Sequence, residues 1–175
     1  MDRREFLGTG AASLAATVAG CVDGSGSDGS ASATRGIRLE SLAVRGSPGG
    51  MLSIRPPGKV VLLDFFATWC APCKPEMANL RAARSTFSPE TVFIVSITQE
   101  TDEAAIKRFW RRYDGTWPVV MDPDLTATER YNVTGIPTII VLTPDGTRVM
   151  RHTGLAGKEK IIANVREALR KAEMG

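Results

Sequence analysis

The segment that most constrains this chain is an apolar run that ends in two closely spaced cysteines. Residues 60–74 read VVLLDFFATWCAPCK. A near-continuous apolar run of this kind is typical of a strand that is buried on both faces of a sheet. From Pro72 to about Phe87 the apolar spacing becomes helical. Cys70 and Cys73 therefore fall where a buried strand gives way to a helix.

This placement favours a redox-active pair of thiols. The spacing puts both sulfurs on one side of the first helical turn, within reach of a disulfide bond. The N-terminus of a helix carries partial positive charge and free N–H groups, which stabilise a thiolate. Cys70 is therefore expected to attack as a thiolate, and the more shielded Cys73 to resolve the mixed disulfide. Pro72 suits the first turn, where its missing N–H costs little.

Strands and helices alternate along the rest of the chain. Mixed α/β order of this kind predicts a mixed sheet covered by helices on both faces. Thr101 is the expected N-cap of the second helix. The chain is expected to form strands at 37–44, 51–54, 59–67, 91–97, 117–122, 137–143 and 147–154, and helices at 72–87, 101–113, 123–133 and 158–173.

Size and charge restrict the possible functions. The 175 residues, 43% of them hydrophobic, suit one globular domain. The net charge of +3 comes without a stripe of basic and aromatic residues, so the chain is not expected to bind nucleic acid.

The first 36 residues read as export and tethering signals. Arg3 and Arg4, followed by Phe-Leu and a mild apolar run, resemble a twin-arginine signal peptide, here residues 1–20. The run ends in Val-Ala-Gly-Cys, which resembles a lipobox with Cys21 as the lipidated residue. Residues 21–36 are rich in Gly, Ser and Asp and predict a flexible tether with a reach of roughly 20 Å. The chain is then an exported lipoprotein on the outer side of the cytoplasmic membrane, with its domain at 37–175. The alternative is an uncleaved anchor with a chance cysteine.

The run VVLLDFFATWCAPCK followed by GIPT at 135–138 resembles the thioredoxin superfamily. It is more similar to the membrane-tethered, extracytoplasmic branch of TlpA/ResA-like thiol-disulfide oxidoreductases. The motif continues to Glu76 as Cys-x-x-Cys-x-x-Glu, a helix and a strand are inserted at 102–122, and an N-terminal hairpin precedes the core. The likeness runs from Ile37 to the C-terminus. It implies a thioredoxin-like fold: a central mixed sheet flanked by helices, with that insertion and that hairpin.

The resemblance also implies roles for two acids. Burial of Asp64 in an apolar strand is expected to raise its pKa. An acid at this position in the family moves the proton of the resolving cysteine, so Asp64 is the predicted general base and acid for Cys73, acting through water. The alternative is a strand-end Asp that reaches solvent. Glu76, one turn beyond Cys73, is expected to tune the same thiols, unless it faces solvent.

A substrate-binding surface is implied as well. The family has a cis proline at the position of Pro137, facing the cysteines, which exposes the backbone of Ile136 to an incoming polypeptide. The alternative is a trans proline that starts a strand. Trp69 and Pro72 are expected to contact the substrate beside Cys70.

Two departures from the family pattern concern the helix after the cysteines and the partner of the buried acid. Many relatives have a proline five residues after the second cysteine, where this chain has Ala78, with Pro75 lying earlier. Thioredoxins pair the buried acid with a lysine on the next strand, but residues 91–97 offer none.

The predicted activity is reduction of disulfides in client proteins. The expected client is an apocytochrome c during haem attachment, or another protein. Such a monomeric enzyme needs a membrane electron donor but no cofactor and no metal. An oxidase or isomerase is the nearest alternative. Others are a structural disulfide, a zinc half-site, a peroxiredoxin-type thiol peroxidase, and a metallochaperone that uses Cys70, Cys73 and His152.

Overall fold

The computed structural model describes residues 36–174. The predicted signal peptide, the tether up to residue 35 and Cys21 lie outside the described residues. Their roles therefore stay predictions.

The described chain is built on one seven-stranded sheet in the order β2-β1-β5-β4-β3-β6-β7. Its strands are β1 (Arg38–Val44), β2 (Ser47–Ser53), β3 (Val60–Phe65), β4 (Val92–Thr98), β5 (Val119–Met121), β6 (Thr138–Leu142) and β7 (Arg148–Thr153). The strand that precedes the cysteines, β3, lies inside the sheet, parallel to β4 and antiparallel to β6. The predicted central mixed sheet is thus confirmed.

The N-terminal hairpin is confirmed too, but its second strand is longer than predicted. β2 begins at Ser47 rather than at Met51 and pairs with β1 along its length. The turn is made at Gly46, whose φ of +79° suits glycine and whose added Cβ would lie 2.1 Å from the backbone of Thr116. Residues 48–50 are Pro-Gly-Gly, and these residue types are depleted in strands, so the sequence pattern places the start of this strand too late.

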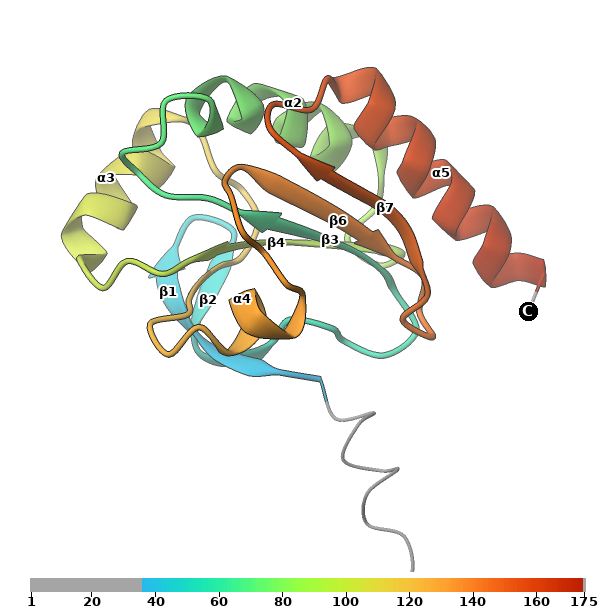
Figure 1. Cartoon of the computed structure of the whole chain (residues 1–175), viewed down its shortest axis with the longest axis horizontal. Helices are drawn as coiled ribbons and strands as arrows, with labels where there is room; N and C mark the ends of the chain where they lie inside the picture. The colour runs from blue at the N-terminus through green and yellow to red at the C-terminus, as the bar shows by residue number, and fades with distance from the viewer. Residues whose placement is uncertain (1–35, 175) are drawn as a thin grey trace, which may run out of the picture. The chain divides into compact units, whose positions relative to one another are not determined.

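Within residues 36–174, four helices cover the sheet: α2 (Cys73–Thr86), α3 (Glu103–Arg112), α4 (Thr126–Arg130) and α5 (Lys158–Met174). Buried residues of α2, α3 and α5 share one core cluster, whereas Ala127 of α4 belongs to a second cluster. Figure 1 shows α2, α3 and α5 along one side of the sheet and the short α4 on the other. Both faces are covered, as predicted, and α3 with β5 forms the predicted insertion.

Some helix ends differ from the predictions. The N-cap of α3 is Asp102, not Thr101, and its carboxylate accepts a hydrogen bond from the Ala105 N–H at 3.0 Å. The helix predicted at 123–133 is confined to the five residues of α4. Pro72 is the N-cap of α2, so the helix begins at Cys73, one residue later than predicted.

Side chains on the two faces of β3 pack in different core clusters. Val61, Leu63 and Phe65 pack in the cluster that includes α4, whereas Val60 and Leu62 pack in the cluster under α2. Because side chains alternate along a strand, Asp64 points to the α2 side. The sheet therefore places this acid beneath the helix that carries Cys73.

Two tryptophans complete the core on the α2 side. Trp110 and Trp117 are each 1% exposed, and their rings meet edge to face with centroids 5.3 Å apart. Both tryptophans therefore serve in the packing of this core. Among residues 36–174, no helix is both long enough and apolar enough to cross a membrane.

Candidate active site

Cys70 and Cys73 form a disulfide at the N-terminus of α2, with their Cα atoms 5.3 Å apart. The Cys70 N–H donates to the Ala67 carbonyl at 3.2 Å, so a tight turn links β3 to the helix. The two cysteines are 4% and 2% exposed. The predicted greater shielding of Cys73 is therefore very small in this oxidised form.

Asp64 is buried in the sheet below this helix. It is 1% exposed, which makes the solvent-reaching alternative wrong. Its Oδ2 accepts a hydrogen bond from Ser96 Oγ at 2.6 Å, and Ser96 Oγ accepts one from Trp117 Nε1 at 2.9 Å. Burial raises the pKa of Asp64 to about 7, against the opposing effect of the Ser96 hydrogen bond. A carboxyl that changes protonation near neutral pH can exchange protons with a thiol.

Glu76 is also buried, at 1% exposure, so the solvent-facing alternative is wrong. Its Oε1 accepts a hydrogen bond from the Ala156 N–H at 2.9 Å, while Oε2 has no partner among the described residues. Burial, followed by the charge of Asp64, raises the pKa of Glu76 to about 8, and the Ala156 hydrogen bond opposes this rise. Two interacting carboxyl groups thus lie beneath the first turns of α2.

Ser96 and Trp117 were missed as partners of Asp64 in the sequence. A signal existed, since Ser96 interrupts the apolar run of β4 and pairs in register with Asp64 of β3. Ser96 lies on the neighbouring strand, which is the strand on which thioredoxins carry the lysine that pairs with the buried acid. The acid therefore meets a neutral hydroxyl there.

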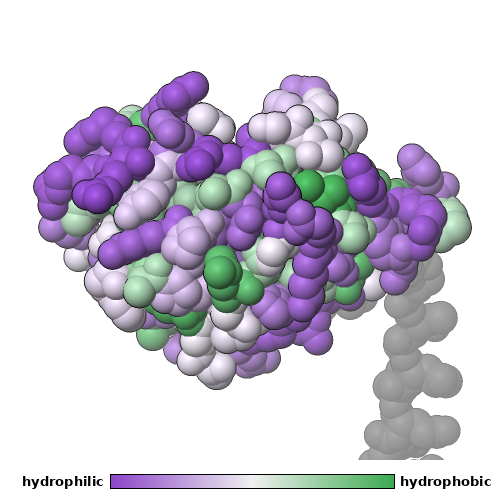
Figure 2. Space-filling view, turned by 90° about the horizontal axis from the view of Figure 1, so that it is seen from above, coloured by the Kyte–Doolittle hydropathy of each residue, from purple (hydrophilic) through white to green (hydrophobic). Residues whose placement is uncertain are grey.

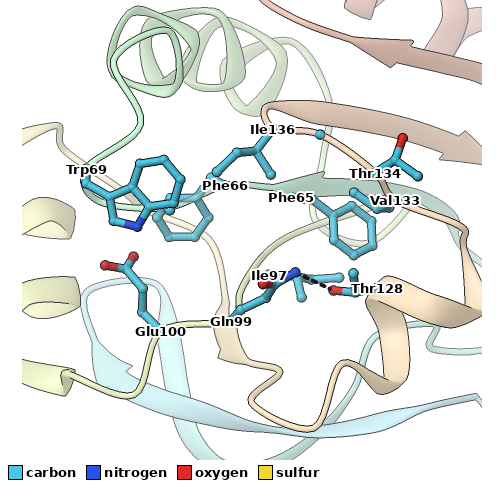
Figure 3. A pocket seen from close by; sticks show the side chains of 12 residues that line it. Phe65, Phe66, Trp69, Ile97, Gln99, Glu100, Thr128, Val133, Thr134 and Ile136 are labelled. Atoms are coloured by element: carbon cyan, nitrogen blue, oxygen red, sulfur yellow. Dashed lines mark hydrogen bonds between the residues drawn. The ribbon is translucent and has the colours of Figure 1, made fainter.

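Pro137 follows a cis peptide bond, as predicted, and its carbonyl accepts a hydrogen bond from the Gly154 N–H at 2.8 Å. Ile136 and Trp69 line one pocket of about 420 Å³. Figure 3 shows Trp69 and Glu100 at one end of this pocket and Val133 and Thr134 at the other. Trp69 is 72% exposed and so forms an accessible wall next to Cys70.

Glu100 is a third residue that the sequence prediction missed. Its carboxylate accepts hydrogen bonds from the Thr68 backbone N–H and from Thr68 Oγ1, both at 2.6 Å. A signal was available, because β3 and β4 are parallel and their carboxyl ends meet at one edge of the sheet. Glu100 fixes the loop that presents Trp69.

Cys70, Cys73 and His152, considered as metal ligands from the sequence, do not form a metal site in the described structure. Within residues 36–174, no three His, Cys, Asp or Glu side chains lie close enough to hold a metal ion. The ring of His152 instead contacts Lys160 Nζ at 2.9 Å and the Leu155 carbonyl at 3.2 Å. The set of Cys70, Cys73 and His152 proposed for a metallochaperone is therefore wrong.

The fold and the disulfide define a thioredoxin-like domain with a dithiol site at a helix N-terminus. A model of the Redoxin family matches residues 50–169, well over half of the chain. The chain belongs to the Redoxin family.

Individual relatives agree with this assignment. The chain is 34% identical over 97 residues to thiol-disulfide oxidoreductase ResA of Bacillus subtilis, covering 55% of this chain and 54% of ResA. It spans about half the length of the curated relatives it matches.

Solved structures confirm the fold. StoA of Bacillus subtilis aligns with a TM-score of 0.62 at 21% identity, over 73% of this chain and 94% of StoA. A secreted disulfide oxidoreductase of Mycobacterium tuberculosis, homologous to E. coli DsbE, aligns with a TM-score of 0.65 at 22% identity, over 77% and 98%.

Proposed function

We propose that this protein is a thiol-disulfide oxidoreductase that reduces disulfides in exported proteins. The observation that carries the proposal is the Cys70–Cys73 disulfide at the start of α2, above two buried carboxyl groups. The similarity to ResA over 97 residues supports the same class of activity.

The reduced protein starts the reaction. The Cys70 thiolate attacks one sulfur of the client disulfide, forming a mixed disulfide and releasing the other client sulfur as a thiolate, which takes up a proton. The Cys73 thiol then loses its proton and attacks Cys70 Sγ. The second client thiolate leaves, so two electrons have passed to the client and the Cys70–Cys73 disulfide has formed.

Asp64 and Glu76 supply the proton exchange for Cys73. The helix places Glu76 one turn beyond Cys73, and β3 places Asp64 beneath the same helix. With pKa values of about 7 and 8, one of the two groups accepts the Cys73 proton while the other stays protonated. The sequence prediction of Asp64 as the base is thus extended to a pair of acids.

The client segment binds at the pocket beside Trp69. Trp69 and Phe66 give this pocket aromatic walls, and Ile136 offers backbone groups to an extended polypeptide. An apolar side chain next to the client cysteine fits this volume of about 420 Å³.

The proposal also includes a lipid tether, a membrane electron donor and a client protein. Lipid on Cys21 tethers the exported domain to the outer side of the cytoplasmic membrane, as the motifs at 1–21 favour. A membrane electron donor re-reduces the disulfide after each turnover. Apocytochrome c, whose thiols must be reduced before haem attachment, is the proposed client.

Trapping tests the activity. The full-length Cys73→Ala variant should accumulate a mixed disulfide through Cys70 with a disulfide-bonded protein such as insulin, because no second thiol can release the client. The control, Cys70→Ala, should trap nothing at that position. Absence of a Cys70-linked product, together with no reduction of insulin by the wild-type dithiol form, would contradict the proposal.

A separate experiment tests the tether. The Cys21→Ser variant should move from the membrane fraction to the soluble exported fraction while its dithiol still reduces insulin. An unchanged membrane fraction would contradict lipidation at Cys21.

A further inference from the structure

A hollow of about 390 Å³ lies on the α3 side of the disulfide loop. It is separate from the pocket beside Ile136, and Thr68, the residue before Trp69, lines it from the loop. Lys74, directly after Cys73, lines it from α2. A ligand in this hollow would therefore lie against both ends of the Cys70–Cys73 motif.

The other wall of the hollow comes from α3. Arg108 and Arg112 are one turn apart on this helix, and both line the hollow with the rings of Phe109 and Tyr113. In Figure 2 hydrophilic side chains gather at the left of the molecule, on the α3 side.

Two features of this arrangement of cations destabilise the protein when no ligand is bound. Arg108 and Arg112 are an i,i+4 pair of like charges, which destabilises a helix. Lys74 lies in the first turn of α2, where the helix dipole disfavours positive charge. Within residues 36–174, none of the three makes an ion pair. A negatively charged ligand would relieve both unfavourable interactions.

The acids at the start of α3 and in the loop before it are engaged elsewhere. Glu103 pairs with Lys107 at 2.6 Å, and Asp102 caps α3. Glu100 binds Thr68 and lines the other pocket, not this hollow. The two depressions beside the disulfide loop thus differ in charge, and the one with Lys74 is positive.

We propose that Lys74, Arg108 and Arg112 form an anion-binding subsite that selects client segments with acidic residues next to the reacting disulfide. The inference rests on the proposed function, since it names the substrate class of the same dithiol. The aromatic walls and the concave shape favour a peptide segment over the flat surface of an anionic membrane.

The test compares two synthetic peptides, each closed by one disulfide. They are identical except that two residues beside one cysteine are Asp in the first and Asn in the second. The second-order rate constant for reduction by the full-length dithiol protein is measured for each. We expect the Asp peptide to react about 10-fold faster at low salt, and the ratio to fall to about 2 near 0.5 M salt as the charges are screened.

The diagnostic variant is the double substitution Arg108→Gln and Arg112→Gln, which leaves the neighbour of Cys73 intact. It should bring the ratio of the two rate constants close to 1. Arg111→Gln is the matched control, because this arginine is on the same helix but lines a different hollow with Arg45. The control should keep the wild-type ratio.

Three results would overturn the inference. The first is a wild-type ratio near 1 at low salt, and the second is an unchanged ratio in the double variant. The third is loss of binding to phosphatidylglycerol vesicles in the double variant without any peptide preference in the wild type, which would assign the cations to a membrane surface. If the wild-type dithiol reduces neither peptide, the proposed function itself fails, and this inference with it.

Discussion

Buried carboxyl groups occur in two regions of the part of the chain that the structure describes, and their hydrogen bonding differs between the two. At the start of α4, Asp122 is fully buried, and its oxygens accept hydrogen bonds from the Ala127 N–H at 3.1 Å, the Thr128 N–H at 2.9 Å and Thr128 Oγ1 at 2.8 Å. Beneath α2, Asp64 accepts one hydrogen bond from a side chain, and one oxygen of Glu76 has no partner in the described residues.

The difference separates a structural acid from a reactive one. The carboxylate of Asp122 holds the N-terminus of a short helix, where donors replace the water it lost. Asp64 and Glu76 lose their water without full replacement, so the protein raises their pKa values instead. Burial alone does not distinguish these acids, whereas the number of donors around each one does.

The largest expected effect is on the pH dependence of stability. The unfolded chain releases the protons of Asp64 and Glu76 near their ordinary pKa values of 3.8 and 4.5, but the folded protein holds them to about 7 and 8. The contribution of these two acids to the free energy of unfolding is therefore fully present below about pH 4 and is lost as the pH rises to 8. For Asp64 this pH-dependent contribution is on the order of 4 kcal/mol.

Denaturant unfolding of the oxidised protein at pH 4 to 8 measures this slope. The double variant Asp64→Asn and Glu76→Gln should flatten it. A wild-type free energy of unfolding that rises between pH 5 and 8 would contradict the raised pKa values.

The second prediction concerns the rate of the reaction. Asp64→Asn should slow the release of a preformed mixed disulfide by Cys73 about 100-fold, because the acid of the pair with the lower pKa can no longer accept the proton. It should also remove an ionisation near pH 7 from the pH–rate profile of Cys73. Stopped-flow measurement of client release gives both, and an unchanged profile would disprove this role of Asp64.

The third prediction tests the structural acid. Asp122→Asn should lower the free energy of unfolding by about 2 kcal/mol, because an amide NH₂ group would meet the N–H donors at the start of α4. Thermal or chemical unfolding measures the loss. The pH–rate profile of Cys73 serves as the control, and a change in it would erase the distinction between the two regions.

The smallest expected effect comes from Ser96→Ala. Loss of its hydrogen bond to the ionised carboxylate should raise the pKa of Asp64, moving the pH–rate profile upward by about one pH unit. Ser96→Thr, which keeps the hydroxyl, is the matched control. A purely structural role of Ser96 would change stability and leave the profile in place.

The sequence predicted the parts of the site that local patterns encode. The strand-to-helix transition located Cys70 and Cys73, and an acid within an apolar run marked Asp64 as buried. Pro137 could be assigned because the GIPT segment resembles a known family pattern. Each of these conclusions needed only neighbouring residues or a resemblance.

The parts that depend on long-range pairing were not predicted. The contact of Glu76 with Ala156 joins residues 80 positions apart, and only the docking of α2 against the β7–α5 connection creates it. The helical pattern around Glu76 does not by itself show whether this side chain is buried or faces solvent. The proposed preference for acidic client segments, to which Arg108 contributes, likewise depends on how α3 packs beside the disulfide loop.

The exposure of Trp69 gives the protein an internal optical reporter. Of the chain's three tryptophans, Trp110 and Trp117 are 1% exposed, whereas Trp69 is 72% exposed and directly precedes Cys70. A water-soluble quencher of fluorescence will reach only the indole beside the disulfide. The fluorescence that such a quencher removes therefore isolates one side chain next to the sulfur atoms, and it can follow electron transfer in the unlabelled protein.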